Sequence, residues 1–134
     1  MSNENVKPTR KYESMKLIIA GSRTIDFYTP FDLHEIICEH FDPYPTEIVC
    51  GMAKGPDLIG RDYALEHEIP VKEFPADWET YGKRAGFIRN DEMAQYADVL
   101  LAIWDGKSNG TRHMIRAMLE LHKPFHVELN LWPS

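Results

Sequence analysis

Cysteine is nearly absent from this sequence of 134 residues, which contains only Cys38 and Cys50. The two are spaced neither as a CxxC pair nor at a zinc-like distance from a histidine, so we expect two buried thiols and no metal site. No apolar run reaches about 18 residues, which excludes a membrane-spanning helix. Residues 1–14 carry no apolar segment after their charges, so we expect no secretory signal there and a cytoplasmic protein.

Positive charge is in the minority, since 15 lysines and arginines oppose 21 aspartates and glutamates and the formal net charge is −6. A protein with this charge is not steered toward a nucleic-acid backbone, so we do not expect a nucleic acid as its main partner. Several cations nevertheless lie in or just after glycine turns or in the long central loop: Arg23, Lys54, Lys83, Arg84, Arg89, Lys107 and Arg112. They either hold a small anion or are ordinary solvated loop side chains.

Short apolar runs alternate with helical segments along the chain. The runs typical of buried strands lie at residues 16–20, 46–50, 69–74, 98–104 and 123–129. This alternation predicts an α/β fold with a single doubly wound, mainly parallel five-stranded sheet of the Rossmann-like type. We assign the domain to residues 15–130, with a flexible N-terminal tail at residues 1–14 and a short C-terminal end at residues 131–134.

Three of the predicted strands end in glycine-containing turns that open a helix, at residues 20–23, 50–57 and 105–111. The free amides of a helix's first turn carry the positive end of the helix dipole and bind phosphate or carboxylate groups. Because the carboxyl ends of parallel strands meet at one edge of the sheet, we expect the three turns to converge on one ligand. The ligand-binding residues expected in these turns are Gly21, Ser22, Arg23, Gly51, Met52, Ala53, Lys54, Gly55, Gly106, Asn109, Gly110 and Thr111.

Further candidate residues lie outside the glycine turns. Asp57 either stabilises the start of its helix as a first-turn acid or accepts a hydrogen bond from a ribose hydroxyl or a base. Trp78 either packs under its loop, which is the preferred interpretation, or stacks on a base. Arg89 and Asn90, expected at the start of a helix, are assigned to a phosphate or its ribose, in preference to Asn90 acting only as a helix cap. Asp77 either acts as an acid or base or only caps a turn.

Several segments of the chain match one known family: Gly21-Ser22-Arg23, VCGMAKGPD at 49–57, FPADW at 74–78, GKRAGFIRNDEM at 82–93 and ADVLLAIWDGKSNGT at 97–111. Through them residues 16–129 resemble the YspA-type branch of the SLOG superfamily, Rossmann-like domains of bacteria and their viruses. The superfamily includes the LOG phosphoribohydrolases and the Rossmann domain of DNA-processing protein A. The resemblance implies a SLOG-type sheet that binds a nucleotide or nucleotide derivative at the carboxyl edge of its strands. It also implies a bacterial or virus-infected cytoplasm and is compatible with a homo-oligomer, because relatives commonly self-associate.

Three functions remain open on the sequence. The first is a sensor or sequestering module for a nucleotide-derived small molecule, without a further cofactor. The second is a hydrolase that cleaves the N-glycosidic or a phosphate bond of a nucleotide. Its acid or base would be Asp57, Asp77 or Asp105, and Arg89 or Arg23 would stabilise charge. The LOG motif has a glutamate three residues after its Gly-Thr, where this chain has Met114, so we rank the hydrolase second. Single-stranded nucleic-acid binding ranks third because of the negative net charge.

Overall fold

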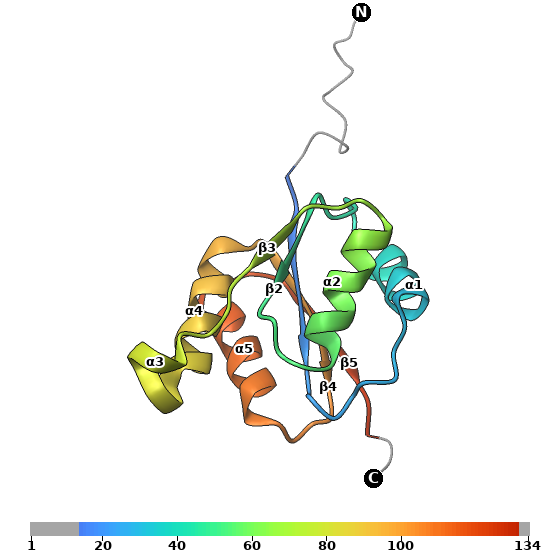
Figure 1. The fold of residues 1–134 in the computed structure, drawn as a ribbon. Coiled ribbons are helices and arrows are strands. Elements are labelled where there is room, and N and C mark those ends of the chain that lie inside the picture. Colours follow the sequence, from blue (N-terminus) through green and yellow to red (C-terminus); the bar gives the residue numbers. More distant parts are fainter. Residues whose placement is uncertain (1–13, 132–134) are drawn as a thin grey trace, which may run out of the picture.

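The computed structural model describes residues 14–131, so nearly all of the predicted tail and C-terminal end lie outside the described residues. The strands are β1 (Lys16–Gly21), β2 (Glu47–Cys50), β3 (Val71–Glu73), β4 (Val99–Trp104) and β5 (Phe125–Leu129) (Figure 1). The helical segments are α1 (Pro30–His40), α2 (Pro56–Glu66), α3 (Trp78–Tyr81), the 3-10 turn η3 (Gly82–Arg84), α4 (Ala85–Tyr96) and α5 (Asn109–Glu120). Among these described helices, none has the length and apolar character needed to cross a membrane.

The five strands form one sheet in the order β3-β2-β1-β4-β5, and every neighbouring pair is parallel. The predicted single, doubly wound α/β sheet is therefore confirmed. The chain first builds outward from β1 to β3 and then crosses back to place β4 on the other side of β1. The strand order thus reverses between β1 and β4, which is the place where open α/β sheets leave room for a ligand.

The helices cover both faces of the sheet. α1 and α2 pack on one face and α4 and α5 on the other, as Figure 1 shows. Strand side chains alternate between these two layers. In β1, Leu17 and Ile19 belong to the core under α1 and α2, whereas Ile18 and Ala20 belong to the core under α4 and α5. Because both faces of the strand are covered, it needs a continuous apolar run rather than an alternating one.

The segment before β4 differs from the prediction. We expected a helix to start at Arg89 and Asn90, but α4 begins at Ala85, so both residues lie inside the helix. α3 and η3 precede it and project away from the sheet. The two glycines of this segment led to the error, because glycine usually interrupts a helix. Gly82 does end α3 with a φ of +59°, but Gly86 is accommodated within α4.

The two cysteines lie in different environments. Cys50 is fully buried, as predicted, and burial raises the pKa of its thiol to about 11. Cys38 is exposed, so the prediction that it is buried is wrong. α1 turns Leu33 and Ile37 toward the core. Cys38 follows Ile37 by one residue, about 100° further round the helix, so its side chain lies outside that buried stripe.

Candidate functional site

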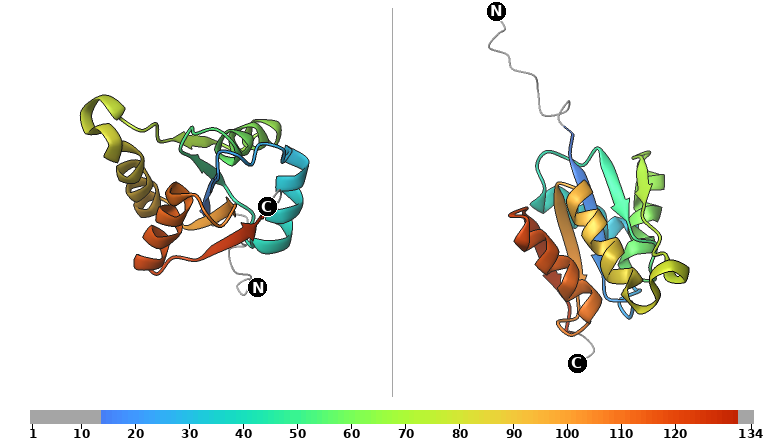
Figure 2. Two further views of the ribbon diagram at one scale, coloured as in Figure 1. Left: turned by 90° about the horizontal axis from the view of Figure 1, so that it is seen from below. Right: turned by 90° about the vertical axis from the view of Figure 1, so that its left-hand side faces the viewer.

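A pocket of about 250 Å³ lies where the strand order reverses, at the carboxyl ends of β1 and β4. The left view of Figure 2 looks onto this edge of the sheet. Many of the predicted ligand-binding residues line the pocket: Gly21, Ser22, Arg23, Ala53, Asp57, Trp78, Arg89, Asn90, Gly110 and Thr111. Segments that are far apart in the sequence therefore supply the walls of one cavity.

The remaining predicted residues do not line the pocket: Gly51, Met52, Lys54, Gly55, Gly106 and Asn109. Two of these glycines shape it indirectly, because they let the loop after β2 approach its neighbours closely. Gly55 has a φ of +82°, and a Cβ atom there would lie 2.8 Å from the carbonyl oxygen of Ser22. A Cβ atom on Gly51 would lie 2.9 Å from Oδ2 of Asp57. Met52 also has a positive φ, of 65°.

Hydroxyl groups connect the turn after β1 to the loop before α5. Oγ of Ser22 lies 2.8 Å from Oγ of Ser108 and accepts the N–H of Asp105 at 3.0 Å. Oγ of Ser108 donates to Oγ1 of Thr111 at 3.2 Å. The backbone N–H of Ser22 donates to the carbonyl oxygen of Ile103 at the end of β4, at 3.0 Å. These bonds fix the first turn of α5 against the end of β1.

Asp57 places a buried carboxyl group at the pocket. It lies in the first turn of α2, as predicted, but only 4 % of the residue is exposed. Burial raises the pKa of this carboxyl from 3.8 to about 7. The Arg89 guanidinium and the backbone amides of Gly21, Gly51 and Ala53 act in the opposite direction and lower that pKa. Near neutral pH the group is therefore present in both its charged and its neutral form.

Arg89 connects α4 to the loop after β2. Nη1 donates a hydrogen bond to the carbonyl oxygen of Gly51, and Nε donates to Oδ1 of Asn90 at 3.1 Å. Burial lowers the pKa of the guanidinium, whereas the nearby carboxyl of Asp57 raises it. A guanidinium has five N–H donors, so Arg89 can hold the loop and still bind an anion in the pocket.

Asn90 connects the two helices on the same side of the sheet. It is 6 % exposed, and its Nδ2 donates to the carbonyl oxygen of Gly110 in the first turn of α5 at 3.1 Å. The same Nδ2 lies 3.4 Å from Nδ1 of His113. The His113 ring stacks on Phe87 with a centroid distance of 4.3 Å, and its Nε2 lies 3.7 Å from the Asp91 carboxylate. These contacts hold the wall of the pocket formed by α4 and α5.

The charge in the pocket is opposite in sign to that of the whole protein. Arg23, Lys83 and Arg89 line it, and among the described lining residues Asp57 carries the single carboxyl group. The first turn of α5 adds the positive end of a helix dipole. A positive pocket in a chain of net charge −6 attracts a small anion without attracting polyanions to the rest of the surface.

The other candidate acids have structural roles. Asp77 caps α3, because its Oδ1 accepts the N–H of Thr80 at 3.1 Å, and it does not line the pocket. Oδ1 of Asp105 accepts the backbone amides two and three residues further on, each at 2.8 Å. These bonds lower the pKa of the Asp105 carboxyl. Of the three candidates, Asp57 is therefore the one that lines the pocket.

Trp78 is 54 % exposed and lines the pocket, so the preferred interpretation that it packs under its loop is wrong. Lys83, one of the cations noted in the sequence as able to hold an anion, also lines the pocket. Five further lining residues were not predicted: Ala20, Gly86, Phe87, Ser108 and Met114. Part of this set could have been found. Once the helix is started at residue 85, Gly86 and Phe87 lie four and three residues before Asn90 and so share its helix face.

Two comparisons relate the chain to known proteins. The family model described as "YspA, cpYpsA-related SLOG family" matches residues 15–81, which is half of the chain. The Gene 61 protein of Mycobacterium phage D29 is 42% identical over 83 residues, covering 58% of this chain and 66% of the phage protein. The match thus spans slightly less than two thirds of that relative. A comparison with solved structures gave no significant match.

Proposed function

Because this chain belongs to the YspA, cpYpsA-related SLOG family, we propose that it binds a nucleotide or a nucleotide-derived small molecule in the pocket at the carboxyl ends of β1 and β4. The observation that carries the proposal is the convergence there of the turn after β1, the loop after β2, and α4 and α5. Such a protein senses the ligand or sequesters it.

The distribution of polar groups supports a ligand with a phosphate and a sugar or base. Arg23 and the first turn of α5 suit a phosphate group, because both present N–H donors and positive charge. Asp57 suits ribose hydroxyls, since a carboxyl group can accept their hydrogen bonds. The exposed ring of Trp78 offers a surface for a base. The volume of about 250 Å³ favours a small ligand over a polymer.

The family resemblance supports two further parts of the proposal. We propose that the protein acts in the cytoplasm of a bacterium or of a phage-infected bacterial cell, and the phage relative supports this location. We also propose a homo-oligomer, which size-exclusion chromatography with light scattering tests directly. Nucleic acid is not proposed as the main partner, because the net charge of −6 opposes a polyanion.

A nucleotide hydrolase is the alternative, and Asp57 is the residue that favours it. A carboxyl group with a pKa of about 7 can accept and return a proton at neutral pH. Met114 lines the pocket at the position where the LOG motif has its glutamate, and a thioether cannot perform acid or base catalysis. The binding function therefore ranks first.

Mass spectrometry of small molecules released from the freshly purified, denatured full-length protein separates these functions. An intact nucleotide at one molecule per chain supports the binder. The native protein is also incubated with a panel of nucleotides. Formation of a free base or ribose phosphate by the wild type, but not by Asp57→Asn, supports the hydrolase. An empty protein whose melting temperature is not changed by any member of that panel overturns the proposal.

A matched pair of arginine variants tests the pocket itself. Arg23 is exposed and lines the pocket, so Arg23→Ala should remove a charge-assisted contact and weaken nucleotide affinity by about tenfold or more. Arg116 is exposed on α5 and does not line the pocket, so Arg116→Ala should leave the affinity unchanged. Single-stranded DNA retained at moderate salt by a protein that binds no nucleotide would favour the third function instead.

A further inference from the structure

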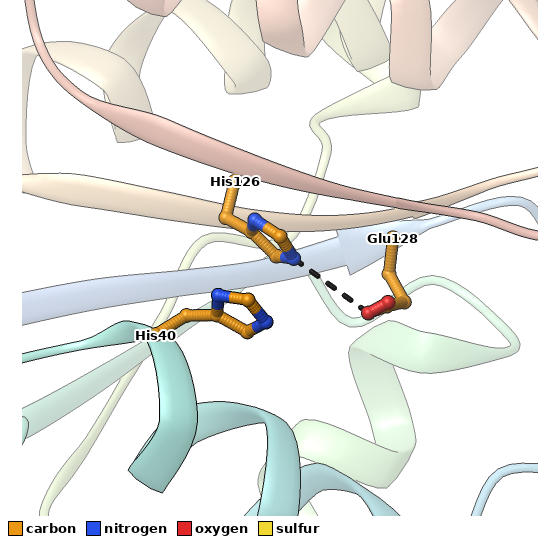
Figure 3. A group of neighbouring side chains, drawn as sticks. All are labelled: His40, His126 and Glu128. Atoms are coloured by element: carbon orange, nitrogen blue, oxygen red, sulfur yellow. Dashed lines mark ion pairs between the residues drawn. The ribbon is translucent and has the colours of Figure 1, made fainter.

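His40, His126 and Glu128 form a cluster that is separate from the pocket (Figure 3). His40 lies in the last turn of α1. His126 and Glu128 lie on β5, which is the edge strand of the sheet next to β4. None of the three lines the pocket at the carboxyl ends of β1 and β4.

The alternation of β5 explains why these side chains meet. Phe125 and Val127 pack against the core under α4 and α5. His126 and Glu128 alternate with them, so both point to the other face of the sheet, where α1 ends. His40 at the end of α1 completes the group, and Figure 3 shows both imidazoles with a nitrogen directed toward the Glu128 carboxylate.

Three atoms that can act as metal ligands lie close together in this cluster. One nitrogen of each histidine and one carboxylate oxygen of Glu128 all lie within 4.8 Å of one another. The two imidazole rings stack with a centroid distance of 3.7 Å and an interplanar angle of 19°. Nε2 of His126 lies 3.6 Å from Oε2 of Glu128.

Nε2 of His126 provides a second, independent observation. This atom is inaccessible to solvent, and within the described part of the chain it makes no hydrogen bond. Its contact with Glu128 is longer than the usual range for such a bond. A buried nitrogen without a partner is costly in free energy, and a metal ion at its lone pair removes that cost.

We propose that His40, His126 and Glu128 bind a Zn²⁺ ion through two imidazole nitrogens and one carboxylate oxygen. Zn²⁺ accepts these ligands at about 2.0–2.2 Å and is usually four-coordinate, so solvent supplies the fourth ligand. The two imidazoles disfavour Mg²⁺ and Ca²⁺, which prefer oxygen ligands. The ion joins the last turn of α1 to the edge strand β5.

Binding requires a modest rearrangement of the side chains. An imidazole binds a metal in the plane of its ring, so two nearly parallel rings must tilt apart before their nitrogens point at one ion. The side chains can make this movement, because those of His40, His126 and Glu128 are 31%, 29% and 30% exposed. None of them is held in a closely packed core.

Calorimetric titration of the full chain with ZnCl₂ tests the site. The titration is made in a Cys38→Ser background, because the exposed Cys38 thiol lies 3.5 Å from Nε2 of His34 and offers a competing pair of zinc ligands. We expect one ion per chain. His40→Gln and His126→Gln should each weaken zinc binding by about tenfold or more.

Two controls separate a specific site from a general attraction of cations. Glu120→Gln removes an exposed carboxylate of α5 outside the cluster and should leave the zinc affinity unchanged. His122→Asn removes an exposed imidazole outside the cluster and should also have no effect. Circular dichroism tests whether each variant is folded. If a histidine variant is unfolded, Glu128→Gln is used in its place.

The site of binding is read from amide chemical shifts in two-dimensional NMR spectra. Zinc should shift the resonances of β5 and of the end of α1, and not those of the turn after β1. Absence of saturable binding at millimolar zinc, or an unchanged affinity in both histidine variants, would overturn the proposal. These outcomes do not bear on the nucleotide pocket, which shares none of the three residues.

Discussion

Oγ of Ser22 lies 2.8 Å from Oγ of Ser108, although the two residues are 86 positions apart in the chain. The contact joins the turn after β1 to the loop before α5, and both residues line the candidate pocket. The same Ser22 oxygen accepts the N–H of Asp105. Ser22 is 1 % exposed, so these bonds are largely shielded from bulk water.

Ser22→Ala should therefore lower the free energy of unfolding by about 1–3 kcal/mol, because it leaves the N–H of Asp105 without its acceptor. Urea denaturation at a fixed pH measures the change. Thr24→Ala is the matched control, since Thr24 is an exposed hydroxyl residue two positions away and its loss should have little effect. Equal losses in the two variants would contradict this role for Ser22.

Asp57 should make the stability of the protein depend on pH. Its pKa is about 7 in the folded chain and near 3.8 when it is exposed, so between these values the native state binds more protons than the unfolded state. Stability should therefore fall as pH rises from about 4 to about 7, by at most roughly 1.4 kcal/mol per pH unit from this group. Above pH 7 the contribution becomes constant.

Asp57→Asn removes this titration, so the variant should show a flatter curve of unfolding free energy against pH between about 4 and about 7. The measured quantity is the slope of this curve and not the stability at one pH, because the asparagine amide also changes the hydrogen bonds at the site. Asp62→Asn, on the same helix but with an exposed side chain, should keep the wild-type slope. An unchanged slope in Asp57→Asn would mean that this carboxyl is charged throughout the range.

Gly55 and Gly110 should respond oppositely to alanine. Gly55→Ala places a Cβ atom 2.8 Å from the carbonyl oxygen of Ser22 at a φ of +82°, and should cost about 1–3 kcal/mol of stability. Gly110 lies in the first turn of α5, where a Cβ atom meets nothing within 4 Å. Gly110→Ala should be neutral or stabilise the protein by up to about 1 kcal/mol. Thermal unfolding measures the stability of both variants. Similar losses of stability in Gly55→Ala and Gly110→Ala would contradict the different roles assigned to the two glycines.

The sheet could be predicted because its strands are buried on both faces. β1 and β4 are covered by helices on each side, and such strands appear in the sequence as continuous apolar runs. The positions of the glycine turns followed from the strands, since parallel strands end at one edge. The strand order could not be predicted, because it depends on which pairs of strands meet after the chain has crossed the sheet.

Individual side chains of the site were harder to predict than its position. The exposure of Trp78 and Cys38 depends on packing between segments, which a local pattern does not contain. The burial of Asp57 could not be predicted for the same reason, because an acidic residue at the start of a helix is usually solvated. The histidine cluster also escaped prediction, since His40 and His126 belong to α1 and β5 and local spacing cannot show that they meet.

The length of β1 limits how this protein can change by insertion and deletion. Leu17 and Ile19 face one core and Ile18 faces the other. At the end of the strand, a Cβ atom on Gly21 would lie 2.2 Å from the carbonyl oxygen of Ile103. One residue more or fewer within β1 turns the side chains on one side of the change to the other layer, or brings a larger residue to the position of Gly21. Natural length variation should therefore be absent from β1 and occur in connecting loops instead.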